Sequence, residues 1–454
     1  MKSTLSVLQK QQQGVVFAVA KLLPLLPLLA LTMYDQAGDA ATYMPYLLFY
    51  TAVKTGLLLA NSRGQVQNAY KLLQRSLLLC VGALLVLTIS SNLIVTDIAA
   101  FLLGLGASVV APSYQGVYYH ERLVWHWFLQ RVELKALGEF SAVILVALGL
   151  ASHFSYRWVL GVIALMVTVG LLVMRRFEPF VKQTDAAVFV PKTQSFSNLE
   201  LFIWTTVMIF AVRYLHYFSA RVAWFALVVA AAGLGLLVLR VLMTHQRILL
   251  MPRWLTLTAL LNGSFESFVL LYLYLAVHTH WLVLLAYFSY ACGLLMAQVL
   301  RRRVQSWFAF PALKVQLVGM LIGAWLMLTP VTLLIGVWLI SFFASANSIL
   351  LGHAAYAQPV ATPAHRLMIK YRSTYLGSII MQFSLIAVIA GVATVSHLDL
   401  SQLMGQLSQT TSIGVTATHF VRDVGVVVVA GLTVITGFAV WRMPGQVEHP
   451  LHQA

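Results

Sequence analysis

Long apolar stretches, each about as long as a bilayer-spanning helix, follow one another along almost the whole chain. A helix needs about 20 apolar residues to cross the hydrocarbon core of a membrane. By this measure the pattern predicts an all-α polytopic membrane protein with about fourteen transmembrane helices. The predicted spans are 14–33, 42–60, 76–94, 98–117, 138–154, 157–174, 199–218, 222–241, 254–277, 281–300, 315–330, 331–352, 374–396 and 423–441.

Composition supports the membrane assignment. Hydrophobic residues make up 60% of the chain and charged residues only 9%, whereas roughly 25% charged residues is usual for a soluble domain. A water-soluble core could not bury this much apolar surface, so we expect lipid to surround the protein. The formal net charge of +16 is spread from loop to loop. A nucleic-acid-binding surface would be clustered, so we expect no nucleic-acid partner.

The distribution of basic residues predicts the orientation of the spans. Cytoplasmic loops of membrane proteins collect Lys and Arg, and every second loop of the fourteen-span arrangement is basic. We therefore predict a multi-pass protein of a bacterial-type cell membrane, with both termini in the cytoplasm. The residues expected in or beside cytoplasmic segments include Arg63, Lys71, Arg75, Arg122, Lys135, Arg175, Arg176, Arg301, Arg302, Arg303, Arg366, Lys370 and Arg372.

Loop lengths and charges suggest an internal repeat. A basic loop joins spans two and three, and a similar one joins spans ten and eleven. If spans seven and eight are an insertion, a six-span unit occurs twice. Duplicated bundles joined by a central linker are a common plan of membrane transporters. The predicted parts are an N-terminal bundle (1–174), a cytoplasmic linker (175–198), two inserted helices (199–253) and a C-terminal bundle (254–454).

Two sequence patterns resemble the major facilitator superfamily, in particular its fourteen-span drug:proton antiporter branch. In span four, LLGLGASVVAPS carries Gly104, Gly106 and Pro112 at the family's spacing. Small residues there allow close helix packing, and proline bends the span. The segment YRWV at 156–159 is similar to the signature that opens span six. The resemblance implies a secondary transporter that works by alternating access, with protons as possible partners.

The loop after span two departs from the family pattern. It retains Gly64, but Asn61 stands where the family has an acidic gate residue, and Ala100 stands where it has an arginine linked to proton coupling. The antiporter glycine–proline motif of span five is also missing. By resemblance, Asn61, Gly64, Gly104, Gly106 and Pro112 are expected to serve in gating or helix packing.

Polar residues inside the predicted spans are the candidates for a substrate or coupling site. An ionised side chain at bilayer depth costs about 2.5–3.5 kcal/mol, and Glu266 lies about halfway along span nine. Thr258 and Asn262 lie on the same helix face at intervals of four residues. A carboxyl group there could take up and release a proton or pair with a cationic substrate. The alternative is a glutamate hydrogen-bonded into helix packing.

Three further residues have two interpretations each. Lys21 in span one either contributes to a binding site or extends its ammonium group to the headgroups. Gln115 in span four and Asn347 in span twelve either line a cavity or join neighbouring helices by hydrogen bonds.

We weigh three functions. The first is a transporter that exports an amphipathic or cationic small molecule. The second is a flippase for a lipid-linked sugar or another cell-envelope precursor, whose substrate would be lipid-like. The third is a polytopic glycosyltransferase acting through Asp35 or Asp39 in the first outer loop. The sequence contains no glycine-rich phosphate loop with its lysine and no metal-ligand spacing, so we expect a protein that is not an enzyme and needs no cofactor or metal.

Overall fold

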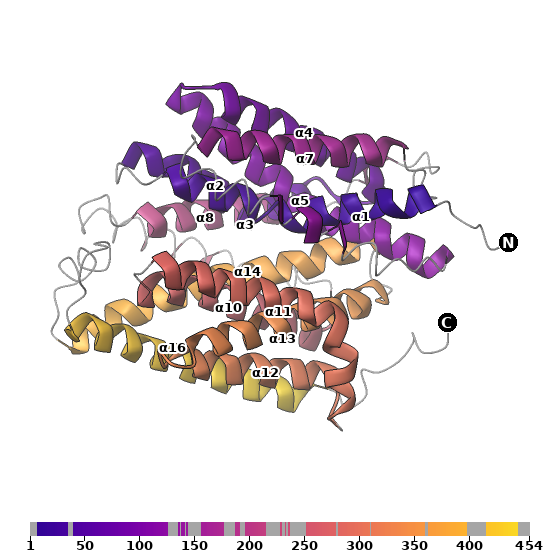
Figure 1. Cartoon of the computed structure of the whole chain (residues 1–454). Coiled ribbons are helices and arrows are strands. Elements are labelled where there is room, and N and C mark those ends of the chain that lie inside the picture. The colour runs from indigo at the N-terminus through magenta and orange to yellow at the C-terminus, as the bar shows by residue number, and fades with distance from the viewer. Residues whose placement is uncertain are drawn as a thin grey trace. The chain divides into compact units, whose positions relative to one another are not determined.

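The structure is a computed structural model that describes residues 7–34, 40–125, 135–136, 138–140, 142–143, 156–176, 187–190, 196–214, 228, 232, 235–236, 251–277, 280–308, 310–358, 362–396 and 415–443. Apart from two short strands, its elements are helices (Figure 1). They are α1 (Val7–Leu22), α2 (Leu26–Tyr34), α3 (Ala40–Ser62), β1 (Gln65–Val66), α4 (Ala69–Ile89), α5 (Leu93–Trp125), α7 (Tyr156–Arg176), β2 (Phe189–Val190), α8 (Phe196–Tyr214), α10 (Arg253–Ala276), α11 (His280–Ser306), α12 (Ala312–Met327), α13 (Leu333–Tyr356), α14 (Pro363–Val395) and α16 (Val415–Arg442).

The prediction of an all-α polytopic membrane protein is confirmed. Within the described residues, seven helices are long and apolar enough to cross a membrane. These lie in α4, α5, α7, α10, α13, α14 and α16, and α8 and α12 contain shorter apolar helices. Predicted spans five and eight lie largely outside the described residues, so their helices stay predictions.

Predicted span one is interrupted. It forms two helices, α1 and α2, separated by a turn that is closed by a hydrogen bond from the Leu25 amide to the Leu22 carbonyl, 2.9 Å long. Pro24 stands in this turn and has no amide hydrogen to donate to a helical ladder. The proline therefore explains the break between the two helices.

The contacts divide the chain into two compact units. Unit 1 contains α1 to α8 and the start of α14 up to Met368, and unit 2 contains α10 to α16, with α14 from Ile369 onward. In unit 1, α5 packs on α3 and α4, and in unit 2, α13 packs on α11 and α12. In the predicted six-span repeat, α3, α4 and α5 would correspond to α11, α12 and α13. The repeat and its boundaries stay predictions. Helix α8 packs on α3 within unit 1.

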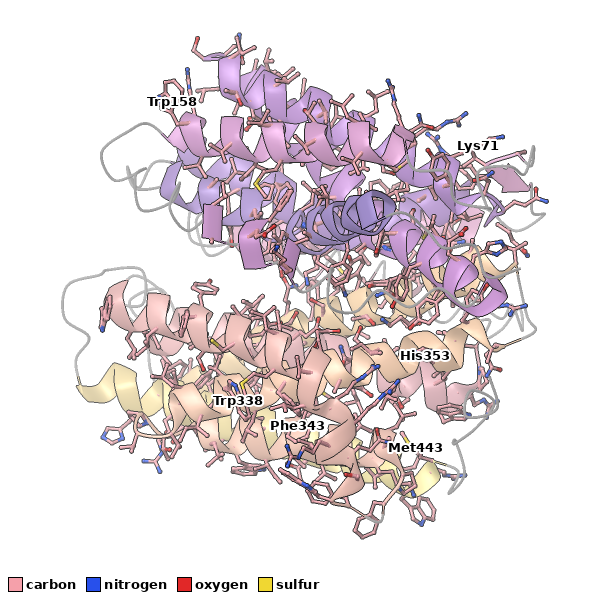
Figure 2. The ribbon with its side chains drawn as sticks, turned by 45° about the vertical axis from the view of Figure 1, so that its right-hand side comes forward. Lys71, Trp158, Trp338, Phe343, His353 and Met443 are labelled. Atoms are coloured by element: carbon pink, nitrogen blue, oxygen red, sulfur yellow. The ribbon has the colours of Figure 1, made fainter. Side chains whose placement is uncertain are left out.

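Helices α4 and α7 of unit 1 run antiparallel. The Tyr70 hydroxyl near the start of α4 donates a 2.9 Å hydrogen bond to the Met174 carbonyl near the end of α7. At the other end of the pair, Thr88 of α4 lies next to Gly161 of α7. Figure 2 accordingly shows Lys71 and Trp158 at opposite ends of these helices.

Glycines allow α5 to approach two neighbours closely. A Cβ atom on Gly104 would stand 2.5 Å from the Phe49 carbonyl oxygen of α3, and one on Gly106 would stand 2.5 Å from Cys80 Sγ of α4. Both distances are shorter than a van der Waals contact. The span-four glycines therefore face α3 and α4, one each, while Pro112 lies within the continuous helix α5.

Candidate functional site

The candidate site is built around Glu266 on α10 in unit 2. Asn262 Nδ2 donates a 2.7 Å hydrogen bond to Glu266 Oε1, and Asn347 Nδ2 of α13 donates a 2.9 Å bond to Asn262 Oδ1. Asn262 and Asn347 are buried, whereas Glu266 is partly exposed. The three side chains form a chain of hydrogen bonds, which we call the α10–α13 polar chain. It runs from a buried amide to an accessible carboxylate.

The polar chain follows from the sequence spacing on α10. Residues four apart on a helix lie on the same face, one turn from each other. The Asn262 amide therefore reaches Glu266 within its own helix and uses its oxygen to accept from α13. A hydrogen bond to a charged acceptor is stronger than one between neutral groups, so the amides fix the position of the Glu266 carboxylate.

Two tyrosines of other helices also interact electrostatically with Glu266. The carboxylate lies within electrostatic range of the phenols of Tyr290 on α11 and Tyr375 on α14. Both tyrosine side chains are partly exposed, as Glu266 is. Four helices of unit 2, α10, α11, α13 and α14, thus contribute polar groups to this site. The sequence alone does not reveal these tyrosines, because nothing in their local pattern distinguishes them from packing or interfacial residues.

Lys370 and Arg372, expected in or beside a cytoplasmic segment, lie within helix α14, and the side of the membrane on which they lie stays a prediction. Helix α14 begins at Pro363, well before the predicted start at 374, and both residues are buried in its body. Lys370 Nζ donates a 2.7 Å hydrogen bond to Ser348 Oγ of α13 and lies 4.2 Å from the ring centroid of Tyr371. A buried charge is costly without such partners, and these contacts explain why the helix can start so early.

Thr258 is not a member of the polar chain. It is buried on α10, and its hydroxyl donates a 2.8 Å hydrogen bond to the Trp254 carbonyl one turn earlier. The polar chain continues to α13 through Asn347 instead.

The remaining predicted substrate residues belong to unit 1. The exposed Lys21 places its ammonium 5.9 Å from the ring centroid of Phe17 on the same helix. Gln115 is partly exposed on α5, and its side-chain oxygen is buried without a hydrogen-bond partner among the described residues. These residues are described within unit 1 alone.

The loop after α3 is held mainly through its backbone. Gly64 has a φ of 123°, a conformation that favours glycine. Strand β1 pairs antiparallel with β2 of the predicted linker, with Val66 opposite Phe189. The Val66 amide donates a 3.3 Å hydrogen bond to Nδ1 of His365. The Asn61 carbonyl accepts from Asn198 Nδ2 at 3.3 Å, and the Asn61 side-chain amide is buried without a partner in the described part of the chain.

The predictions of a glycosyl-transfer site and of a protein without a metal both stay predictions. Asp35 and Asp39, the candidates for glycosyl transfer, lie outside the described residues. In the part of the chain that the structure describes, no three His, Cys, Asp or Glu side chains gather to form a metal site.

Comparison with known proteins shows which solved structures have a similar fold. No family profile and no curated protein matches the sequence. Several solved transporter structures do match. The POT family transporter PepTSo is 13% identical, with a TM-score of 0.52 and coverage of 96% of this chain and 98% of the other. A mutant of the peptide transporter POT is 12% identical, with a TM-score of 0.53 and coverage of 95% and 92%. The proton:xylose symporter XylE of the major facilitator superfamily is 11% identical, with a TM-score of 0.50 and coverage of 94% of each chain.

These likenesses extend over nearly the full length of the chain and establish its fold. The protein has the fold of major facilitator superfamily transporters. The drug:proton antiporter branch suggested by the motifs in spans four and six stays a prediction.

Proposed function

We propose that the protein is a secondary active transporter that moves an amphipathic or cationic small molecule across the membrane by alternating access. The α10–α13 polar chain carries this proposal, because it fixes a partly exposed carboxylate on a membrane-spanning helix. Ionisable groups at that depth are expensive and usually functional. The fold shared with proton-coupled and peptide transporters supports the same conclusion.

In the proposed mechanism, Glu266 binds either a proton or the cationic part of the substrate. Its ionised form accepts the hydrogen bond from Asn262, and its exposed side can meet a ligand. A proton on Glu266 removes the charge that the cation would pair with, so the two ligands compete for one carboxylate. Such competition couples their movements when access alternates between the two sides of the membrane.

A direct test replaces Glu266 with Gln, which preserves size and hydrogen bonding but removes the titration. The probe is ethidium, a fluorescent lipophilic cation, in inverted membrane vesicles. Glu266→Gln should abolish proton-coupled ethidium transport, whereas Glu266→Asp should retain part of it.

The matched control is Glu139→Gln. Glu139 is 61% exposed and pairs with Lys135 at 3.7 Å, so its loss should leave ethidium transport unchanged. Normal transport by Glu266→Gln at every pH would refute the proposed role of Glu266.

The buried cations of α14 favour a second candidate, a flippase for a lipid-linked anionic precursor. Lys370 and Arg372 lie in the same unit as Glu266 and are both buried, and a phosphate-bearing headgroup would be attracted to them. The test measures translocation of a fluorescent polyprenyl phosphate in proteoliposomes. This function would be favoured over the first if the wild-type protein translocates the lipid but not ethidium, and if Lys370→Gln loses lipid translocation.

A further inference from the structure

One end of unit 2 combines exposed cations with exposed aromatic rings. Helix α11 ends there, and its residues Arg302 and Arg303 are both exposed. The connection to α12 exposes Trp307 and Phe310, each by 69%. The Trp307 amide donates a 3.2 Å hydrogen bond to the carbonyl of Val304, three residues earlier. The exposed rings therefore belong to a hydrogen-bonded turn directly after the arginines.

Helix α16 reaches the same end of unit 2. Trp325 Nε1 of α12 donates a 3.2 Å hydrogen bond to Thr433 Oγ1 of α16. Leu328, which follows α12 in the chain, lies against Gly425, which precedes Thr433 on α16. The two helices, which lie side by side in Figure 1, therefore run antiparallel. The end of α16 is thus directed toward the start of α12, where the connection from α11 arrives.

Two rings and a cation form a cluster at the end of α16. The ring centroids of Phe438 and Trp441 are 6.2 Å apart. The Arg442 guanidinium carbon lies 5.6 Å from the first centroid and 5.0 Å from the second, and all three side chains are exposed. A ring face attracts a guanidinium group without using its N–H donors. These donors can therefore still bind the oxygen atoms of an anion.

The exposed side chains along α16 change in the same order as the layers of a bilayer leaflet. Exposed aliphatic residues come first, followed by an aromatic residue and a final cation: Val427, Val434, Ile435, Trp441 and Arg442. Aliphatic side chains suit the hydrocarbon core, tryptophan is enriched at the interface, and basic side chains are attracted to anionic headgroups. The end of α16 therefore has the side-chain chemistry that matches the phosphate level of a leaflet.

Positive charge dominates this end of unit 2. The sequence contains no Asp or Glu between Glu266 and Asp399, a stretch that includes all of α11, α12 and α13. On α16, Asp423 precedes Thr433 and so lies toward the opposite end. Among the residues of unit 2 that the structure describes, no carboxylate therefore belongs to this end. The phosphate groups of anionic lipids carry the complementary charge and attract basic side chains at a membrane surface.

We propose that this end of unit 2 binds an anionic phospholipid, with its arginines on the phosphate and its rings against the glycerol and the upper acyl chains. Arginine suits phosphate, because its planar donors bind two oxygen atoms at once. We call this surface the basic aromatic end, and it consists of Arg302, Arg303, Trp307, Phe310, Trp441 and Arg442. The proposal does not depend on the role of Glu266.

The first test compares two lipids with the same acyl chains, phosphatidylglycerol and phosphatidylcholine. Native mass spectrometry of the full-length protein in detergent measures how much of each lipid stays bound. Each basic side chain near an anionic surface contributes roughly fivefold in affinity. The wild-type protein should therefore bind phosphatidylglycerol at least about tenfold more tightly than phosphatidylcholine. Equal binding of the two lipids would overturn the proposal.

A matched pair of arginine variants separates a site from general attraction to a basic protein. Arg442→Gln should weaken phosphatidylglycerol binding roughly fivefold. Arg75→Gln, which removes an exposed arginine of α4 in unit 1, should leave it unchanged. Both side chains are exposed, so size-exclusion chromatography should give the wild-type profile for both variants. Equal weakening by the two variants would overturn the specific site.

A pair of tryptophan variants tests the rings. Trp441→Ala should weaken phosphatidylglycerol binding several-fold, because Arg442 loses its nearer ring and the acyl chains lose a contact. Trp158→Ala, which removes a 69% exposed ring of α7 in unit 1 (Figure 2), should have no effect. Equal binding by these two variants would overturn the part of the rings in the site.

Two further outcomes of the same measurement distinguish other occupants. Glycerol phosphate, a headgroup without acyl chains, should fail to displace phosphatidylglycerol, because the exposed rings bind the apolar part of the lipid. Displacement would mean that the surface binds a free anion, which overturns the lipid assignment. A dimer that forms only without lipid and is lost in Trp441→Ala would show that a second copy of the chain covers this surface, which also overturns the proposal.

Discussion

At the scale of single residues, the proposed coupling depends on how the Glu266 carboxylate is held. Asn262 is the central member of the α10–α13 polar chain, since it donates to Glu266 and accepts from Asn347. It is 1% exposed, so water cannot readily replace these two hydrogen bonds. Removal of its side chain leaves both neighbours without this partner.

We expect Asn262→Ala to lower the free energy of unfolding by about 1–3 kcal/mol, the usual cost of leaving buried polar groups unsatisfied. Thermal unfolding in detergent would measure this change. Thr258→Val is the control, because the Thr258 hydroxyl bonds only one turn back within its own helix and should cost about 1 kcal/mol or less. Equal stability of the two variants would argue against the polar chain as a structural feature.

The sequence identified only part of this site. Glu266 and Asn262 could be connected in advance because four-residue spacing puts them on one helix face. Asn347 could be selected as a polar residue within a span, but its partner depends on how α10 and α13 pack. Tyr290 and Tyr375 could not be found, since their proximity to Glu266 arises only from the assembly of separate helices.

At the scale of the elements, glycines determine which helices pack most closely. The span-four motif positions Gly104 against α3 and Gly106 against α4. In unit 2, Gly263 of α10 lies against the backbone of α14, and Gly377 of α14 lies against the backbone of α10. The motif glycines were visible in the sequence. Gly263 and Gly377 were not, because they lie in different helices and match no pattern that the chain shares with the family.

We expect Gly104→Ala to destabilise the protein by about 1–3 kcal/mol, the usual cost of overpacking a close contact. The reason is that its Cβ would stand 2.5 Å from a backbone oxygen that cannot move aside. Gly82→Ala on α4, where no atom lies within 4 Å of the Cβ position, should have no such effect. Equal melting temperatures for the two variants would contradict the close α3–α5 contact.

Helix α14 begins earlier than hydropathy alone predicts, at Pro363 instead of residue 374. A hydropathy window treats Lys370 and Arg372 as loop residues because it counts charge and ignores partners. In the structure, Ser348 and Tyr371 contact the Lys370 ammonium, so the helix tolerates this charge. Such contacts come from tertiary packing and leave no trace in the local sequence.

At the scale of the whole molecule, the apolar pattern predicted the fold class well. It separated α12 from α13 despite a short connection. The likeness of the fold to solved transporter structures over nearly the full length of the chain agrees with it. The orientation of the spans stays a prediction that rests on the loop charges.

Accessible cysteines would test that orientation. In a background without Cys80 and Cys292, cysteines introduced at Ser195 and Arg302 should react with a membrane-impermeant maleimide only from the cytoplasmic side, since both positions lie in basic segments of the chain. A cysteine at Ser408 should react only from outside. Labelling of positions 195 and 302 from opposite sides would refute the fourteen-span topology.

In the proposed function, Glu266 couples proton movement to the movement of a small molecule. The most direct measurement is ethidium accumulation in proteoliposomes under an imposed pH gradient. We expect the purified wild-type protein to accumulate ethidium against its concentration gradient. Glu266→Gln should catalyse at most downhill equilibration, because it cannot exchange a proton. Uphill accumulation by Glu266→Gln at the wild-type rate would contradict the account.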